Sequence, residues 1–265
     1  MGLSRRALLE LLGLSASFSA LSGALLAAGT RKLGLIFPPA GRGVPEEGVS
    51  MYADSVEFLV ENLGLETMTP EGYDAVVDRI GPMAAKLVER GAEAVVLMGT
   101  SLSFYQGEAF NQELTREMRE ATGLPVVTMS TAIIEGLKAV GAERLVAATA
   151  YNDEVNARLR RFLIEHDFEV LAVQGLGIEA VEDIFSVTQP QLIDFGAEVY
   201  ASAADVDGIL VSCGGLRTLE ILEPLERRCN VPAVSSTPHA LFAGAKLLGL
   251  SGHVPGYGRL LSGSA

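Results

Sequence analysis

Three short turns carry the side chains with which this sequence could do chemistry. They are Gly99-Thr100-Ser101, Ala150-Tyr151-Asn152-Asp153 and Ser212-Cys213-Gly214-Gly215, and each follows an apolar run. Hydroxyl groups and the free N–H groups at a helix start donate hydrogen bonds to anions, and glycine lets the backbone approach a ligand closely. The turns therefore predict a cradle of uncharged donors for a carboxylate and for the charge that develops on it as an enolate forms.

Cys213 lies in the middle of this predicted cradle. A thiol can give or take a proton near neutral pH when its surroundings adjust its pKa. A cysteine at the end of a buried strand can equally be a small apolar core residue, so its position alone leaves both interpretations open. Cys229 is expected to pack in a helix or to lie half exposed, and His239 is a candidate for the rim of a cleft.

Apolar runs suited to buried strands alternate with helical patterns from residue 31 onward. The runs are rich in Val, Ile and Leu without polar alternation, as expected for strands covered on both faces. The predicted strands are residues 33–37, 94–98, 125–129, 144–149, 169–173, 208–212 and 232–235. The predicted helices include residues 73–90, 112–122, 153–166 and 190–204. This alternation predicts a parallel sheet with helices on both faces.

The chain also looks duplicated. Residues 91–101 and 206–215 each form an apolar run that ends in small or hydroxyl residues, and each is followed by a helix, a Pro-led strand and Ser/Thr. The repeat predicts an α/β fold of two similar Rossmann-like parallel-sheet domains related by pseudo-twofold symmetry. We expect one domain from residues 31–128 plus 237–265 and another from 129–236. The active site is expected in the cleft between them, because ligands bind beyond the carboxyl ends of parallel strands.

Composition excludes several classes of protein. The 265 residues are 49% hydrophobic, and 33 acidic against 20 basic residues give a net charge of −13. Such a chain lacks the positive surface that binds nucleic acid or an anionic membrane, and it favours a monomer. Two cysteines and three histidines argue against a disulfide scaffold and a zinc site. We expect no nucleic-acid partner, no stable membrane insertion and no metal.

Two further patterns bear on compartment and cofactor. Residues 1–30 combine Arg5-Arg6 with a mildly apolar run and small residues at its end, which predicts a twin-arginine export signal and a periplasmic protein. The alternative is a frayed terminal helix in a cytoplasmic protein. Gly41-Arg42-Gly43 lacks the third glycine of a dinucleotide fingerprint, and no phosphate loop or serine-nucleophile elbow occurs.

Several segments resemble the arylmalonate decarboxylases, a family of the aspartate/glutamate racemase superfamily. They are Leu97-Met98-Gly99-Thr100-Ser101-Leu102-Ser103-Phe104-Tyr105, Ala109-Phe110-Asn111, Met118 through Pro125, Ala148-Thr149-Ala150-Tyr151, Leu210 through Leu216, and Pro255-Gly256-Tyr257-Gly258-Arg259-Leu260. The resemblance runs from about Leu33 to the C-terminus. The superfamily's duplicated two-domain α/β fold agrees with the repeat described above.

The resemblance implies a cofactor-free, asymmetric decarboxylation of α-aryl or alkenyl malonates, which are small dicarboxylates, to chiral monocarboxylic acids. One carboxylate would be held by Thr100, Ser101, Tyr151 and the N–H groups of the Cys213-Gly214-Gly215 turn. The other would lie in an apolar pocket, where loss of CO₂ leaves an enediolate that Cys213 protonates. By the same matching the pocket is formed by Leu65, Met68, Val181 and Ile184, and the site is also lined by Pro39, Gly99 and Gly215. Met68 stands where a smaller Val is usual, which would narrow the pocket.

The number of cysteines separates this activity from its relatives. Racemases of the superfamily carry one cysteine on each face of the substrate, and Gly99 occupies the position of the first here. A single proton donor predicts one enantiomer. The alternatives are a racemase or cis–trans isomerase of the superfamily, which needs a second thiol, and an exported carboxylate-binding protein, which binds without turnover.

Overall fold

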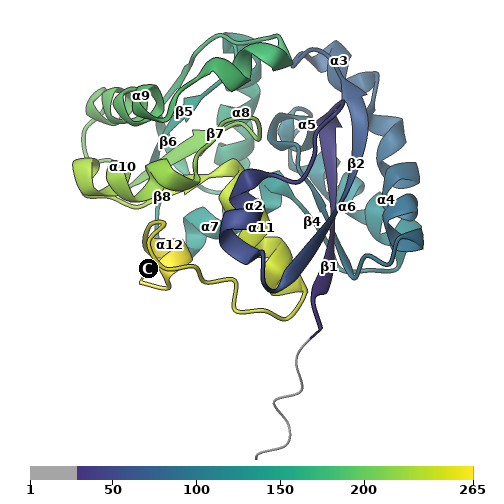
Figure 1. Cartoon of the computed structure of the whole chain (residues 1–265). Coiled ribbons are helices and arrows are strands. Elements are labelled where there is room, and N and C mark those ends of the chain that lie inside the picture. Colours follow the sequence, from purple (N-terminus) through teal and green to yellow (C-terminus); the bar gives the residue numbers. More distant parts are fainter. Residues whose placement is uncertain (1–28, 265) are drawn as a thin grey trace, which may run out of the picture.

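The computed structural model describes residues 29–264, which form two four-stranded parallel sheets (Figure 1). The first sheet has the order β2-β1-β3-β4, with strands β1 (Arg31–Pro39), β2 (Val56–Leu65), β3 (Ala94–Leu97) and β4 (Val126–Thr128). The second has the order β6-β5-β7-β8, with strands β5 (Arg144–Thr149), β6 (Glu169–Gly175), β7 (Gly208–Ser212) and β8 (Ala233–Ser235). The two orders are the same, so the predicted pair of similar parallel-sheet halves is confirmed.

Helices follow the strands in both halves. Those up to β5 are α2 (Glu46–Tyr52), α3 (Pro70–Asp74), the short 3₁₀ helix η1 (Val77–Arg79), α4 (Ile80–Glu89), α5 (Thr100–Phe104), α6 (Glu108–Thr122) and α7 (Met129–Ala139). Those after β5 are α8 (Asp153–Glu165), η2 (Val181–Ser186), α9 (Gln189–Ala201), η3 (Leu219–Ile221), α10 (Leu222–Cys229), α11 (Ser236–Leu247) and α12 (Arg259–Ser262).

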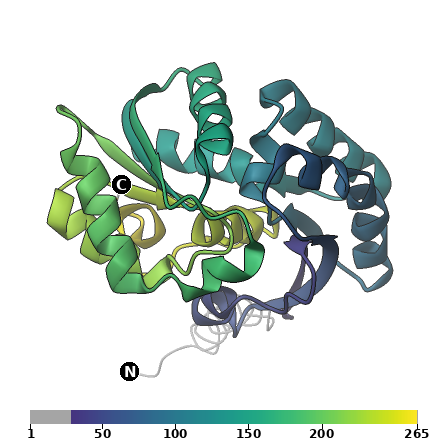
Figure 2. The same ribbon diagram turned by 90° about the horizontal axis from the view of Figure 1, so that it is seen from above.

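The two halves appear as separate lobes when the molecule is seen from above, one blue and one green to yellow (Figure 2). The helix after the last strand of each sheet crosses between the halves: α7 contacts β4 and β8, while α11 contacts α7, β3 and β4. This packing brings the start of α11 close to the first sheet. The exact limits of the predicted domains stay a prediction.

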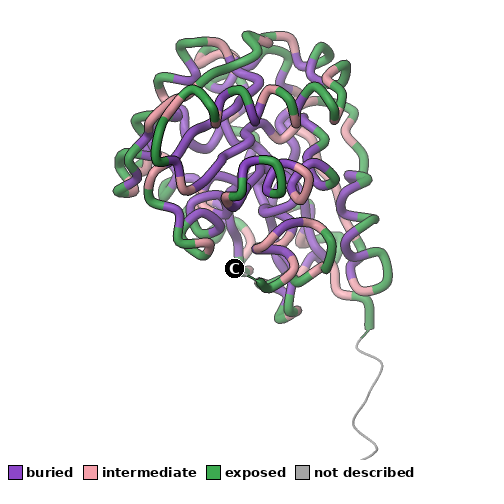
Figure 3. Tube along the Cα trace, turned by 90° about the vertical axis from the view of Figure 1, so that its left-hand side faces the viewer, coloured by how far each residue is buried: buried purple, intermediate pink, exposed green. Residues whose placement is uncertain are grey.

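Buried residues fill the interior of the molecule and exposed ones lie on its outside (Figure 3). All four residues of β3 and all five of β7 are buried, as expected for central strands of a parallel sheet with helices on both faces. The buried residues of both lobes belong to one continuous hydrophobic cluster. The strand ends that carry the predicted turns are therefore held by a rigid core.

Strand β2 was not predicted from the sequence. It pairs in parallel with β1 at the edge of the first sheet, and its residues alternate irregularly between buried and partly exposed. An edge strand needs no continuous apolar run, and Glu57, Glu61 and Asn62 interrupt this one. The search for apolar runs therefore missed it.

The helix predicted over residues 73–90 is interrupted. The chain forms α3, η1 and α4 in succession instead. Thr69 caps α3 by accepting the N–H of Gly72, and Pro70 begins that helix. Pro82 cannot donate a backbone hydrogen bond and is best accommodated in the first turn of a helix, so α4 begins at Ile80.

The predicted leader, residues 1–30, lies almost wholly outside the described residues, and export stays a prediction. Within residues 29–264 no helix has both the length and the apolar character needed to cross a membrane. In the same part of the chain, no three His, Cys, Asp or Glu side chains are grouped so that they could hold a metal ion.

Candidate active site

All of the predicted site residues except Tyr151 line one pocket between the two halves, with about 450 Å³ of free space including its open end. The predicted residues in its wall are Pro39, Leu65, Met68, Gly99, Thr100, Ser101, Val181, Ile184, Cys213, Gly214 and Gly215. The pocket lies beyond the ends of β1, β3 and β7, where parallel strands present ligand-binding turns.

The apolar side of the pocket is built by both halves. Leu65 ends β2 and Met68 follows it, whereas Val181 and Ile184 belong to η2. All four are buried. Thr67 and Ala180 form an antiparallel bridge beside them, and the Met68 N–H donates to the Glu179 carbonyl at 3.1 Å. Backbone pairing between the halves thus fixes a wall with no hydrogen-bonding side chain.

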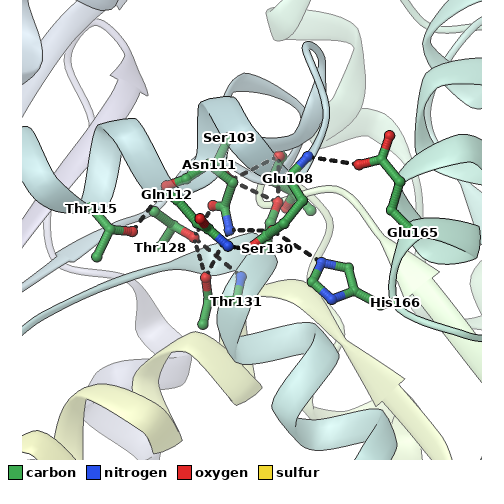
Figure 4. A network of polar contacts seen from close by, with 11 residues as sticks. Ser103, Glu108, Asn111, Gln112, Thr115, Thr128, Ser130, Thr131, Glu165 and His166 are labelled. Carbon is green, nitrogen blue, oxygen red and sulfur yellow. Dashed lines mark hydrogen bonds and ion pairs between the residues drawn. The ribbon is translucent and has the colours of Figure 1, made fainter.

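Buried hydroxyl groups hold the turn at Thr100 and Ser101 from behind. The Ser103 hydroxyl lies 2.7 Å from both the Gly99 carbonyl and the Ser130 hydroxyl, and Ser130 donates to the Thr100 carbonyl at 2.9 Å. Figure 4 shows that these serines lie beside a wider network. That network continues through Glu108, Asn111, Thr128, Thr131, Glu165 and His166.

The Thr100 hydroxyl also reaches the second half of the molecule. It donates to Ser236 Oγ at 2.9 Å, and the same Ser236 oxygen accepts the N–H of Cys213 at 3.1 Å. Ser236 is fully buried at the start of α11. The N–H of Cys213 therefore has an acceptor within the protein, and its place in the carboxylate cradle stays a prediction.

The Cys213 side chain is buried, and Arg42 is the charged residue that lines the pocket with it. Burial raises the pKa of its thiol to about 11, although the N–H groups of Gly215 and Leu216, the Arg42 guanidinium and the Tyr151 hydroxyl act in the opposite direction. The thiol is therefore protonated at neutral pH. The same N–H groups face the sulfur and would stabilise a thiolate after it has given up its proton.

Tyr151 stands behind the pocket and is absent from its wall. Its side chain is buried, its hydroxyl lies 3.3 Å from Ser212 Oγ, and its ring packs edge-on against Phe104. Burial is the main cause that raises its pKa, while hydrogen bonds from Ser212 and Thr100 act to lower it. Tyr151 thus contacts the turns of both halves and keeps a neutral hydroxyl beside Cys213.

Arg42 and Phe185 are pocket residues that were not predicted, as are Phe37, Pro38 and Met98. Arg42 lines the pocket with its Cζ atom 4.7 Å from the centre of the Phe185 ring and 5.7 Å from that of Phe37. The cradle is therefore not composed of uncharged groups alone. In the sequence, Arg42 stands three positions after Pro39, at the end of the first apolar run, and this position could have indicated a site residue. From the sequence, Gly41-Arg42-Gly43 was interpreted only as a possible nucleotide-binding motif.

Tyr73 is a further group that sequence analysis did not identify. Its ring is fully buried against Tyr105, and its hydroxyl has no hydrogen-bond partner within residues 29–264. Burial raises its pKa, and the neighbouring Ser101 hydroxyl acts to lower it. Tyr73 therefore places a neutral hydroxyl next to one of the predicted binding residues.

His239 does not lie at the rim of the cleft. It is buried in α11, where Nδ1 lies 3.0 Å from the Ser235 nitrogen and 2.9 Å from the Ser235 oxygen. Burial lowers its pKa to about 4, so it is neutral at pH 7. His239 does not line the pocket and acts as a core residue.

Comparisons with known proteins agree with this geometry. The family model described as arylmalonate decarboxylase matches residues 33–261. Arylmalonate decarboxylase from Bordetella bronchiseptica is 48% identical over 238 residues, which cover 89% of this chain and 99% of that protein. A solved structure of an arylmalonate decarboxylase variant in the liganded form superposes with a TM-score of 0.86 at 47% identity and covers 89% of this chain and 100% of that one. The maleate isomerase Iso from Pseudomonas putida S16 shares the fold, with a TM-score of 0.83 at 20% identity over 89% of this chain and 100% of that one.

The duplicated parallel sheets and the pocket between them define an enzyme of the aspartate/glutamate racemase-like superfamily. Within it, this chain belongs to the arylmalonate decarboxylase family. The predicted family resemblance is confirmed, as is the expectation of an enzyme of the carboxy-lyase class.

Proposed function

We propose that the protein removes one carboxylate of an α-aryl or α-alkenyl malonate as CO₂ and protonates the other fragment on one face to give a chiral monocarboxylic acid. The protein's own groups carry the reaction, without a cofactor. The proposal rests on the 48% identity to an arylmalonate decarboxylase and on the two chemically distinct sides of the pocket.

The polar side of the pocket suits the carboxylate that is retained. Thr100 and Ser101 present hydroxyl groups there, and the N–H of Gly214 has no hydrogen bond recorded within the described residues. The buried Tyr151 hydroxyl supports this side through its contacts with Ser212 and Thr100. Preorganised donors of this kind stabilise charge that develops in a transition state.

The apolar side suits the carboxylate that leaves. The side chains of the apolar wall, Leu65, Met68, Val181 and Ile184, offer an anion no hydrogen-bond donor. Neutral CO₂ does not need one, so this wall favours the product over the carboxylate. As the bond between Cα and this carboxylate breaks, its electron pair moves to the retained group and forms an enediolate. The donors on the polar side stabilise the charge so formed.

Cys213 then supplies the proton. Its thiol hydrogen is transferred to Cα of the enediolate, and the resulting thiolate recovers a proton from water. Among the pocket residues only Cys213 and Arg42 are ionisable, and a guanidinium does not release its proton near neutral pH. The observation that carries the proposal is that the pocket holds one thiol, Cys213, and that burial raises its pKa to about 11 and so keeps it protonated at neutral pH.

The test is turnover of phenylmalonate and of methyl(phenyl)malonate by the purified chain, followed by chiral analysis of the second product. We expect CO₂ release from both and one enantiomer of 2-phenylpropionate in excess. Tight binding without CO₂ release would support a binding protein instead. A racemic product would contradict protonation by one thiol.

A further inference from the structure

We propose that Arg42 selects substrates whose α-substituent carries an acidic group, such as a carboxylate on the aryl ring. This inference rests on the proposed decarboxylase function and adds the substrate class. It follows from the position of the Arg42 side chain, from its lack of a protein partner and from the direction that an α-substituent must take.

The Arg42 guanidinium is held in place without being neutralised. Its backbone is fixed to β2, because its N–H donates to Asn62 Oδ1 and its carbonyl accepts from Asn62 Nδ2, both at 3.1 Å. The side chain lies against the rings of Phe37 and Phe185. Within residues 29–264 the guanidinium makes no hydrogen bond to a carboxylate or carbonyl and no ion pair. Its donors are therefore open to a ligand.

Partial burial makes this cation sensitive to a bound anion. Desolvation lowers the pKa of Arg42, and the charges of Glu47 and Cys213 act to raise it. Phe185 is half exposed although it is a large apolar residue, and Arg42 covers one face of its ring. A planar guanidinium stacked on aromatic rings keeps its edge free for bidentate pairing with a carboxylate.

Arg42 lies where the pocket meets a neighbouring hollow. A second hollow, which we call the outer hollow, shares Arg42, Phe185, Gly214 and Gly215 with the pocket and contains none of the four apolar-wall residues. Another hollow shares Pro39, Leu65, Val181 and Phe185 with the pocket and does not contain Arg42. The outer hollow thus adjoins the pocket without including the four residues of the apolar wall, although Gly215 lies against Ile184 of that wall.

The α-substituent has one direction left. The retained carboxylate takes the polar side and the leaving carboxylate the apolar wall, so the third group on Cα extends along Gly214 and Gly215 towards the outer hollow. The guanidinium of Arg42 stands at that boundary. Another arginine of this hollow, Arg217, is already paired with Glu46, which leaves Arg42 to bind an acidic substituent.

The test is a comparison of kcat/KM for (4-carboxyphenyl)malonate with that for phenylmalonate, expressed as a ratio. In Arg42→Met, which keeps an unbranched apolar side chain, the ratio should fall at least about tenfold, because a charge-assisted pair is lost. Arg42→Lys should give an intermediate ratio, and added salt should lower the ratio of the wild-type enzyme. The matched control, Arg217→Met, should keep the wild-type ratio.

The possible outcomes separate this inference from the proposed function. If both malonates are turned over and Arg42→Met leaves the ratio unchanged, Arg42 does not read the substituent and the inference is wrong. An equal loss for both substrates would show that Arg42 binds the malonate carboxylates themselves, which also overturns it. If the wild-type chain releases CO₂ from neither malonate, the proposed function fails first. Thermal denaturation of each variant verifies that it is folded.

Discussion

Thr100 donates a hydrogen bond to Ser236 at 2.9 Å, although the two residues are 136 positions apart in the chain. Thr100 follows β3 in the first sheet and Ser236 follows β8 in the second. Because Ser236 also accepts the Cys213 N–H, one buried oxygen connects the turn at Thr100, which we propose holds the carboxylate, to the turn at Cys213. A bound carboxylate can take the Thr100 hydrogen while Ser236 rotates to donate to Thr100.

Ser236→Ala should therefore impair activity and stability together. The change leaves the buried Cys213 N–H without an acceptor, which costs about 1–3 kcal/mol of unfolding free energy. It also removes the support of the Thr100 hydroxyl, so we expect kcat/KM for phenylmalonate to fall at least about tenfold. Urea denaturation and steady-state kinetics measure the two effects. The control is Ser202→Ala, which removes a hydroxyl that donates to the Val199 carbonyl of α9. Equal losses of activity and stability in both variants would contradict a special role of Ser236.

Gly99→Cys should add a second proton donor and destabilise the protein. A Cβ at Gly99 would lie 2.6 Å from Pro38 Cγ and 3.2 Å from Leu102 Cβ, so the proline ring must shift. We expect a loss of about 1–3 kcal/mol of unfolding free energy from this overpacking. Because Gly99 matches the position of the first racemase cysteine, the variant should racemise 2-phenylpropionate. Unchanged optical purity in deuterated buffer, with no deuterium at Cα, would count against this geometry.

Val181→Asp should strongly impair turnover by placing a carboxylate in the apolar wall. The new charge repels the leaving carboxylate and brings water to it, and both effects oppose loss of CO₂. We expect kcat to fall at least about tenfold, since the barrier rises by more than 1.4 kcal/mol. Val49→Asp makes the same change at an exposed position of α2 and should keep full activity. If Val181→Asp behaves like this control, the two carboxylates bind the other way round.

Glu47 makes the stability of the fold depend on pH. Its carboxylate oxygen accepts the N–H groups of Thr218 at 2.8 Å and Leu219 at 3.0 Å, but burial, opposed by these bonds, raises its pKa to about 7. The charge of Glu220 also raises this pKa, and that of Arg217 lowers it. The pKa of Glu47 in the folded state is above its unfolded value near 4.5, so protonated Glu47 contributes to the unfolding free energy. This contribution is complete below about pH 4.5 and is lost as the pH rises through about 7.

Glu47→Gln should remove this pH dependence while keeping an acceptor oxygen. Relative to the variant, the wild-type protein should lose about 2 kcal/mol of unfolding free energy between about pH 5 and about pH 8. Urea denaturation at both pH values measures the difference. Glu46→Gln, an exposed neighbour on the same helix, is the control. A constant difference between wild type and Glu47→Gln across this range would show that Glu47 is already charged in the folded protein.

The sequence predicted those parts of the fold that local patterns determine. Buried strands such as β5 and β7 were predicted with the bounds that the structure gives, because central strands of a parallel sheet require continuous apolar runs. Edge strand β2 needs no such run and was missed. The turns at Thr100 and Cys213 were predicted because they follow central strands, and the repeat indicated that they would meet.

The residues that were not predicted depend on contacts between distant segments. Nothing near Ser236 in the sequence indicates that its oxygen would accept from both Thr100 and Cys213. The Arg42 side chain stacks on Phe185, which η2, some 140 positions later in the chain, places against it. The charge and polarity of a site between two halves are decided by such pairs, which local sequence patterns do not record.

The rate of CO₂ release from phenylmalonate by Cys213→Ser, measured beside wild type and Cys229→Ser, tests the central claim most directly. Cys229 is the other buried cysteine and does not line the pocket, so its variant should remain active. The account predicts that Cys213→Ser loses at least about 10²-fold in rate, as expected when a general acid is removed. A Cys213→Ser enzyme that is nearly as fast as wild type would contradict proton transfer from this thiol.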